Sequence, residues 1–138
     1  MPENIKLEIV TPEMSVVSED VQIVMAPGTL GEFGVLKNHT PFMTTLNLGT
    51  VHYKDVDGNE RFVFISGGFA EALPDKVTIL AESAERRAEI DLERAKSALK
   101  RAEDRLASED NKDTNYERAQ ISLQRALHRI KLAQSKRI

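Results

Sequence analysis

The chain has 138 residues but no cysteine, few aromatic residues (5%) and no long apolar run. Without cysteine there is no disulfide framework and no thiolate chemistry. A membrane-spanning helix needs roughly 20 consecutive apolar residues, and no segment of the sequence approaches that length. Residues 1–10 include acidic side chains and lack the apolar centre of a signal peptide. These absences predict a soluble, cytoplasmic protein that does not insert directly into a membrane.

Residue patterns that carry catalysis or metal binding are also lacking. There is no Gly-x-Ser-x-Gly elbow and no pairing of a nucleophile with a base, so we expect no catalytic residues and no enzyme activity. The three histidines, His39, His52 and His128, are scattered, and none stands at helical spacing from another ligand. Surface or turn positions therefore explain them better than a metal site does, and no metal is expected.

Three glycines, Gly28, Gly31 and Gly34, are spaced by three in the segment 27–34. This spacing superficially suggests a phosphate-binding loop. The segment lacks the Gly-Lys-Ser/Thr ending of a Walker A loop, however, and does not match a dinucleotide fingerprint. We therefore interpret 27–34 as a loop whose glycines allow tight backbone turns.

The first part of the chain predicts short strands separated by turns. Alternating apolar residues begin at Ile5, and Asp57-Gly58 is a strong hairpin signal. The expected strand segments are 5–9, 16–17, 21–25, 42–48, 51–56, 61–65 and 77–80. Strands at this spacing without intervening helices favour a β-sandwich or barrel.

The composition changes at Glu82, after which there is neither glycine nor proline. Asp91 is suited to be the N-cap of a helix, and the polar segment 108–114 separates two stretches of helical periodicity. Each stretch carries one narrow apolar seam, formed by Leu92, Ala95, Leu99, Ala102 and Leu106 and by Tyr116, Ala119, Leu123, Ala126, Ile130 and Ala133. The pattern predicts an antiparallel helical hairpin. Because alanine buries little apolar area, this hairpin should be only modestly stable and able to move.

Charge is divided unevenly between the two parts. Up to Glu82 there are five basic and twelve acidic residues, a net charge of −7, and from Glu85 onward fourteen basic and ten acidic residues, a net charge of +4. The division suggests two modules with different partners, although helices carrying more charge of both signs would also explain it. Few aromatic residues and no recognised motif argue against nucleic acid as a partner.

The hairpin arginines lie at helical spacing. Arg94 and Arg101 share one face of the first helix, and Arg118, Arg125 and Arg129 share one face of the second. Folded back, the helices could present these guanidinium groups to a common phosphate or carboxylate. The alternative is that they flank the seam in solvent and pair with nearby glutamates.

Several segments together resemble the epsilon subunits of bacterial F-type ATP synthases. One signature lies at 27–41, with Gly31-Glu32-Phe33-Gly34 at its centre, and a second at 65–71. The segments 7–12 and 90–96 match the family as well. The motifs follow one another in the family's order and cover essentially the whole chain.

The resemblance implies an α+β protein with a ten-stranded β-sandwich, residues 1–84, followed by a two-helix hairpin, residues 85–138. In this family the protein is a non-catalytic central-stalk subunit of a proton- or sodium-translocating synthase. It is peripheral on the cytoplasmic face of the inner membrane and monomeric when isolated. The sandwich would bind the gamma subunit and the ring of c subunits, with Glu32 and His39 at this rotor interface.

The resemblance also implies a regulatory role for the hairpin. Extended, its basic second helix would meet acidic segments of the alpha and beta subunits and inhibit ATP hydrolysis. No cofactor is required, but ATP would be a regulatory ligand of the folded hairpin. The family's ATP-binding positions correspond to Glu85, Ile90, Asp91, Arg94, Arg101, Arg125 and Arg129. A free-standing ATP sensor and a coiled-coil adaptor outside the motor are the alternative functions.

Overall fold

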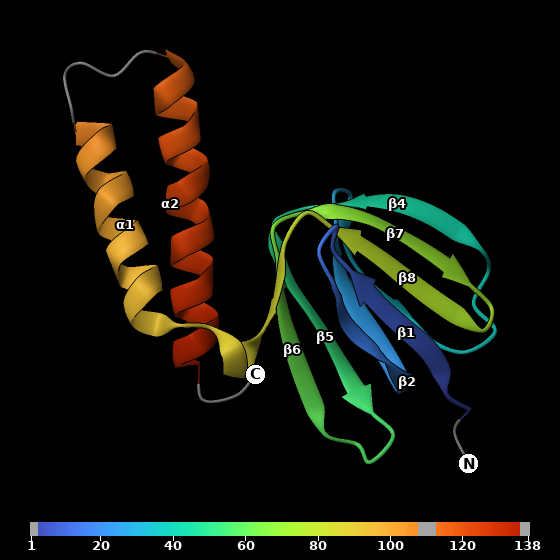
Figure 1. The fold of residues 1–138 in the computed structure, drawn as a ribbon. Coiled ribbons are helices and arrows are strands. Elements are labelled where there is room, and N and C mark those ends of the chain that lie inside the picture. The colour runs from blue at the N-terminus through green and yellow to red at the C-terminus, as the bar shows by residue number, and fades with distance from the viewer. Residues whose placement is uncertain (1–2, 108–112, 136–138) are drawn as a thin grey trace. The chain divides into compact units, whose positions relative to one another are not determined.

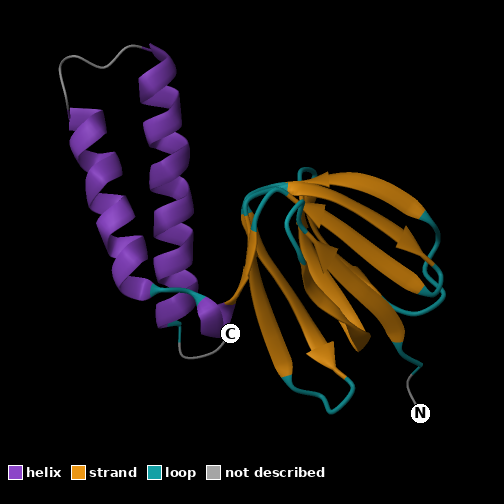
Figure 2. Ribbon diagram, viewed as in Figure 1, coloured by secondary structure: helices purple, strands orange, loops and turns teal. Residues whose placement is uncertain are grey.

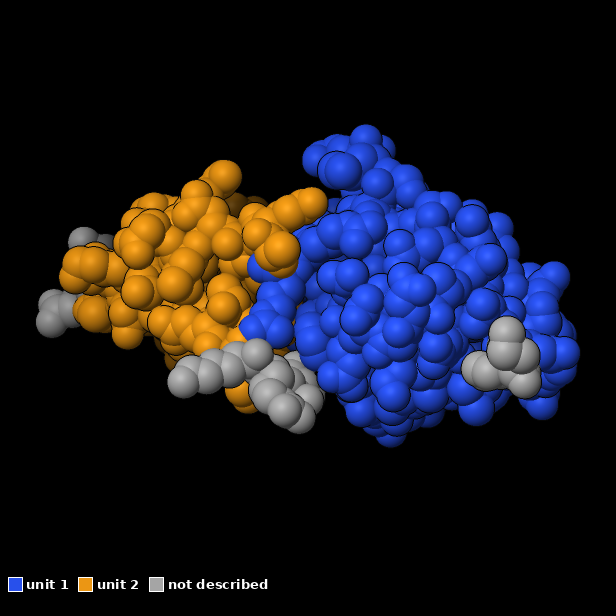
Figure 3. Space-filling view, turned by 90° about the horizontal axis from the view of Figure 1, so that it is seen from below, with its two compact units in different colours: residues 1–87 blue, residues 88–138 orange. Residues whose placement is uncertain are grey.

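The computed structural model describes residues 3–107 and 113–135. The chain forms two compact units, Met1–Arg87 and Ala88–Ile138, which Figure 3 colours separately. The first unit contains all the described strands and the second contains the two long helices.

Within the described residues, nine strands join one hydrogen-bonded sheet. They are β1 (Ile5–Val10), β2 (Ser15–Gly28), β3 (Gly31–Val35), β4 (Phe42–Leu46), β5 (Gly49–Asp55), β6 (Glu60–Ile65), β7 (Gly68–Leu73), β8 (Lys76–Ala81) and β9 (Ala84–Arg86). Their order is β1-β8-β7-β4-β2-β5-β6-β9, with β3 paired to β2 and β1 also paired to β2. The ten strands expected from the resemblance are therefore nine in this part of the chain.

The long strand β2 turns the sheet into a sandwich. It has 14 residues, and the segments expected at 16–17 and 21–25 are parts of this one strand. Its first half pairs with β1 and its second half with β3 and β5, with an irregularity in the β5 register between Val21 and Ile23. Since such an irregularity bends a strand without ending it, β2 crosses between layers. Figures 1 and 2 show β1, β4, β7 and β8 in one layer and β5 and β6 in the other.

The core lies between the two layers. Ile5, Leu7 and Ile9 on β1 are fully buried and alternate with half-buried residues, as the sequence predicted. β6 departs from this alternation, because all four residues from Phe62 to Ile65 are buried. Val63 and Ile65 belong to the core, so the two phenylalanines occupy the other face of β6.

Three strands were not predicted: β3, β7 and the three-residue β9. The first two were missed for a physical reason. In β3 the loop interpretation is wrong for Gly34, which lies in the strand opposite Met25. A β-carbon at Gly34 would lie 2.6 Å from the Met25 Sδ, so this glycine allows close packing rather than a turn. In β7 the buried positions are Ala70 and Ala72, which give a weak apolar signal in the sequence.

The hairpin between β5 and β6 confirms the turn predicted from Asp57-Gly58. Gly58 has a φ of 83°, which glycine adopts without steric cost. The Asp55 Oδ1 accepts hydrogen bonds from the backbone N–H groups of Asp57 at 3.0 Å and Asn59 at 2.9 Å. The Asn59 N–H, together with the Arg61 guanidinium at 3.2 Å, holds the pKa of Asp55 below its ordinary value.

The second unit is the predicted antiparallel hairpin. A short 3₁₀ helix, Arg87–Glu89, precedes α1 (Leu92–Ala107) and α2 (Asp113–Gln134), and α1 and α2 run side by side in Figure 1. Most of the predicted break at 108–114 lies outside the described residues, and its end is wrong because α2 begins at Asp113.

The predicted alanine seam is confirmed. Ala95 and Ala102 on α1 and Ala119 and Ala126 on α2 are all buried. The prediction is wrong for Tyr116, which is 47% exposed, and it missed a residue on another face of α2, Leu132, which is only 4% exposed. A single seam drawn through one heptad pattern cannot identify a second buried face on the same helix.

Candidate interaction surfaces and nucleotide site

The turn between β2 and β3 places an apolar side chain and a carboxylate in solvent. Leu30 is fully exposed, and the Glu32 side chain, near the start of β3, is 56% exposed. Gly31 allows the turn with a φ of 131°. Thr29 braces it, because its N–H donates to the Thr45 carbonyl at 3.0 Å and the two hydroxyls are 2.7 Å apart. A braced turn with these exposed side chains is suited to contact with another protein.

His39 lies in a different turn, between β3 and β4. Its Nδ1 is 2.7 Å from the Thr40 carbonyl oxygen, and its ring centroid is 5.0 Å from that of Phe42. Phe42 also packs edge-on against Phe33, the sequence neighbour of Glu32, at 5.2 Å. Glu32 stands near the start of β3 and His39 beyond its end. The structure therefore places the two expected rotor residues at opposite ends of β3, with Glu32 inside the strand and His39 in the turn that follows it.

A third surface was missed by sequence reasoning because β7 was not recognised. We define the outer apolar face as Val10, Met43, Phe69 and Leu80, on the side of β1, β4, β7 and β8 away from the core. Leu80 pairs across the sheet with both Phe69 and Val10. Met43 is 70% exposed, and Phe69 and Leu80 are each 55% exposed. A hollow beside this face is lined by Val10, Thr11, Pro12, Gly68, Phe69, Leu80, Ala81 and Glu82.

Val10, Leu80 and Phe69 adjoin through the strand register, whereas Met43 lies opposite Glu71 and diagonally from Phe69. Exposed apolar side chains grouped on a sheet face indicate a protein-binding surface. The signal that could have found this face is the alternation within 68–73, where Phe69, Glu71 and Leu73 are exposed. The alternation is weak in the sequence because the two inward residues, Ala70 and Ala72, are only slightly apolar.

The seven expected ATP-binding residues fall in both units. Glu85 is on β9, opposite Phe64, in the first unit. Ile90, Asp91 and Arg94 lie close together along the chain at the start of α1. The Asp91 Oδ1 accepts a hydrogen bond from the Arg94 N–H at 3.0 Å, which confirms Asp91 as the N-cap. Asp91 therefore has a structural function that does not depend on any nucleotide.

The four arginines form two pairs, one on each helix. Arg94 and Arg101 are exposed on α1, whereas Arg125 and Arg129 are half-buried on α2, one turn apart. This arrangement gives each helix a cationic stripe beside the alanine seam. A phosphate group is one anion that such guanidinium pairs can bind.

Two further groups have shifted titration. On α2, burial and, to a lesser extent, Lys131 hold the pKa of His128 below its ordinary value. In the sandwich, burial raises the pKa of Tyr53, with the carboxylate of Glu19 adding to the shift. The Tyr53 hydroxyl lies 3.4 Å from Nη1 of Arg86, which attaches β9 and its neighbour Glu85 to the rest of the sheet.

Among the described residues there is no group of three or more His, Cys, Asp or Glu side chains that could hold a metal ion. No helix in that part of the chain is both long and apolar enough to cross a membrane.

The chain is thus an α+β protein, a β-sandwich with exposed apolar side chains followed by an antiparallel helical hairpin with arginines on both helices. Two family models match the chain. The ATP synthase delta/epsilon chain β-sandwich domain covers residues 4–87, and the ATP synthase delta/epsilon chain long α-helix domain covers residues 88–134. The chain therefore belongs to the ATP synthase delta/epsilon chain family.

Individual relatives confirm the resemblance to epsilon subunits. The chain is 54% identical to an ATP synthase epsilon chain of Desulforapulum autotrophicum, over 99% of this chain and 100% of that one. It is 63% identical to the ATP synthase epsilon chain of Desulfosudis oleivorans, over 78% of this chain and 81% of the relative. Its fold matches a chain of the Euglena gracilis mitochondrial ATP synthase (OSCP/F1/c-ring) with a TM-score of 0.78 and 26% identity, covering 92% of this chain and 79% of that one.

Proposed function

We propose that the chain is a non-catalytic central-stalk subunit of an F-type ATP synthase, in which the sandwich is the anchor and the hairpin inhibits ATP hydrolysis. The observation that carries the proposal is the match to epsilon chains along the whole chain. The exposed apolar side chains of one sheet face and of the β2–β3 turn support it. The protein would be peripheral, on the cytoplasmic face of the inner membrane.

The outer apolar face is the surface proposed for the gamma subunit. Met43, Phe69 and Leu80 are exposed together on one sheet face, and burying them against a partner would remove apolar area from water. The turn carrying Leu30 and Glu32 is the surface proposed for the ring of c subunits. A single turn offers a smaller contact than the sheet face, so we expect the gamma contact to dominate affinity.

The hairpin is the part proposed to inhibit. Residues 88–138 include twelve basic and nine acidic residues, a net charge of +3, which favours approach to acidic segments of the alpha and beta subunits. The seam at the centre of the hairpin is largely alanine, so separating the helices exposes less apolar surface than separating leucine-rich helices would. These two properties support a hairpin that can change conformation and bind along an acidic surface.

The test is inhibition of ATP hydrolysis in a catalytic head preparation stripped of its own epsilon subunit. The whole chain and residues 1–87 are each added, and both binding and hydrolysis are measured. If the sandwich is the anchor and the hairpin the inhibitor, both proteins bind and only the whole chain inhibits. Binding of neither protein would contradict the assignment to the stalk. Equal inhibition by both would contradict the role of the hairpin.

Matched variants test the outer apolar face. Phe69→Asp should weaken binding to the gamma subunit at least tenfold, because a buried interface charge without a partner is costly. Val56→Asp is the control, since Val56 is similarly exposed (52%) but lies on the β5–β6 turn, away from that face. An equal loss of binding in the two variants would argue against this surface.

We also propose ATP as a regulatory ligand of the hairpin, bound through Arg94, Arg101, Arg125 and Arg129. The stripes on α1 and α2 support the proposal because guanidinium groups bind phosphate oxygens strongly. Calorimetric titration of the whole chain with Mg-ATP should show binding that Arg101→Gln weakens. Arg118→Gln is the control, since it removes an exposed arginine of α2 outside the expected set.

Unchanged calorimetric titration in Arg101→Gln, or an equal loss in Arg118→Gln, would contradict this nucleotide site. Circular dichroism of each variant checks that the hairpin remains helical.

A further inference from the structure

His52 on β5 lies beside the carboxylate of Glu32, which follows the β2–β3 turn proposed above as the contact with the c-subunit ring. Its Nε2 is 4.0 Å from the Glu32 Oε2 on β3. That nitrogen is shielded from solvent and makes no hydrogen bond within the described part of the chain, although the side chain as a whole is 29% exposed. A buried ring nitrogen without a partner is uncommon, because burial without a hydrogen bond has a free-energy cost.

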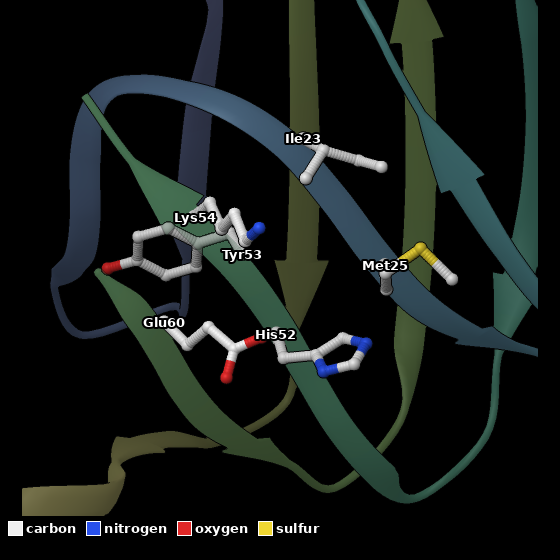
Figure 4. A pocket seen from close by; sticks show the side chains of 6 residues that line it. All are labelled: Ile23, Met25, His52, Tyr53, Lys54 and Glu60. Carbon is white, nitrogen blue, oxygen red and sulfur yellow. The ribbon is translucent and has the colours of Figure 1, made fainter. Parts of the chain in front are cut away.

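The strand register explains how the two side chains meet. Met25 on β2 pairs with Gly34 of β3 on one side and with His52 of β5 on the other. Glu32 is two residues before Gly34, so alternation places it on the same face. Because position 34 has no side chain, nothing from that residue stands between the carboxylate and the imidazole. Figure 4 shows the imidazole pointing away from Tyr53, its neighbour on β5.

The side chains of His52 and Glu32 differ in how closely they are packed. The His52 ring lies 5.9 Å from the ring of Phe62 on β6, a residue that is only 8% exposed. The Glu32 side chain is more than half exposed and can change rotamer at little cost. Moving the carboxylate by about 1 Å would bring the pair to the 2.7–2.9 Å typical of a charge-assisted hydrogen bond. Such a bond requires a protonated imidazole for its full strength.

We propose that His52 positions Glu32 in a proton-dependent manner. Protonated, His52 draws the carboxylate onto the sheet and forms an ion pair. Neutral, it leaves the carboxylate directed to solvent, where the turn can present it to a polar or basic partner. The proposal depends on the proposed function only in taking the β2–β3 turn as the contact with the c-subunit ring.

Other charged side chains of the first unit lie near His52, on β5, on β6 and at Arg87. Lys54 follows on the same strand face and pairs across the sheet with Glu60 of β6, so these opposite charges offset one another. The Arg87 guanidinium lies over the aromatic ring beside His52. Of these groups, only the Glu32 carboxylate comes within ion-pair distance of the imidazole. Glu32 is therefore the group that responds most to a proton on His52.

The test is nuclear magnetic resonance of the whole isolated chain between pH 8 and 6, where imidazoles gain a proton and most carboxylates do not. The carboxyl ¹³C resonance of Glu32 and the amide resonances of 28–34 should move together with the imidazole of His52. In His52→Gln the Glu32 response should disappear. His39→Gln is the matched control, since it removes the histidine of the other turn and should leave the Glu32 response unchanged.

A Glu32 response that persists in His52→Gln, or that is lost in His39→Gln, would overturn the proposal. Matching circular dichroism spectra and thermal midpoints would show that the variants remain folded. In a second measurement, binding to a detergent-solubilised ring of c subunits should be about two- to fivefold weaker at pH 6 than at pH 8, and this pH difference should vanish in His52→Gln. If the resonances are coupled but ring binding is absent at both pH values, the rotor assignment fails while the His52–Glu32 coupling stands.

Discussion

Gly68→Ala should destabilise the sandwich far more than alanine at another glycine of comparable backbone conformation. Gly68 is the first residue of β7 and pairs with Ala81 of β8. A β-carbon there would overlap the carbonyl oxygen of Leu80 and lie 2.9 Å from the Ala81 Cα. Both obstacles are backbone atoms, which cannot rotate away as a side chain can. The strands β7 and β8 would therefore have to separate locally.

The magnitude has two parts. The φ of Gly68 is 150°, and forcing a side chain into such a conformation costs about 1–3 kcal/mol. Weakening one or two ladder hydrogen bonds adds about 1 kcal/mol each. We expect a total loss of about 3–4 kcal/mol, a large share of the roughly 5–15 kcal/mol by which domains are stable.

Gly31→Ala is the control that separates these parts. Gly31 has a φ of 131°, but nothing lies within 4 Å of a β-carbon built on it. Only the conformational cost applies, so the loss should be about 1–2 kcal/mol. The difference of about 2 kcal/mol between the variants measures the steric clash with β8.

The assay is urea unfolding followed by tyrosine fluorescence. The chain has two tyrosines and no tryptophan. Tyr53 is buried in the sandwich and Tyr116 is exposed on α2, so a Tyr116→Phe background leaves one reporter in the sandwich. With a slope of about 1 kcal/mol per molar urea, the Gly68→Ala midpoint should lie about 2 M below that of Gly31→Ala. Equal midpoints would refute the reasoning from the backbone clash.

Three further predictions concern single side chains. Asp91→Ala should lower hairpin stability by about 1 kcal/mol because the hydrogen bond from the Arg94 N–H to the capping side chain is lost. Asp91→Asn should retain most of that stability. Hydrogen exchange of the first turn of α1 measures the effect of both variants. Because burial and Lys131 hold the pKa of His128 below its ordinary 6.5, protonation favours the unfolded hairpin. Its thermal midpoint should fall as the pH drops from 7.5 through 6, and a decrease of the same size in His128→Gln would contradict this. The pKa of Asp55 is lowered, so the stability that this carboxylate contributes is fully present above the ordinary pKa of 3.8 and is lost as the pH falls below it. In Asp55→Asn, the free energy of unfolding should therefore fall less steeply with pH below about pH 4 than in the unmodified chain.

The local features of the chain could be predicted because they depend on neighbouring residues. The alternation around Leu7, the Asp57-Gly58 turn, the Asp91 cap and the alanine seam through Ala102 and Ala126 all have the predicted structures. Each of these features is signalled by residues close together in the sequence, where hydrophobic periodicity and capping residues indicate the secondary structure.

The predictions were wrong where packing between segments far apart in the chain decides the structure. The sequence pattern predicted a loop at Gly34, but this residue pairs with Met25 of β2 and is part of β3. β7 was not predicted because its buried inward residues are Ala70 and Ala72, which give a weak apolar signal in the sequence. Leu132 appeared outside the seam, yet it is buried. Sequence periodicity within one segment carries no information about what packs against a second face.

The sequence by itself determined the family, the order of strands followed by helices, the uneven charge and the residues expected to bind ATP or the rotor. Only the tertiary structure decided which of those residues share a surface. It joins Val10, Met43, Phe69 and Leu80 into one apolar face and brings His52 within 4.0 Å of Glu32. The reason is that cross-strand register, which aligns residues far apart in the chain, depends on the packing of the whole sheet and not on any one segment.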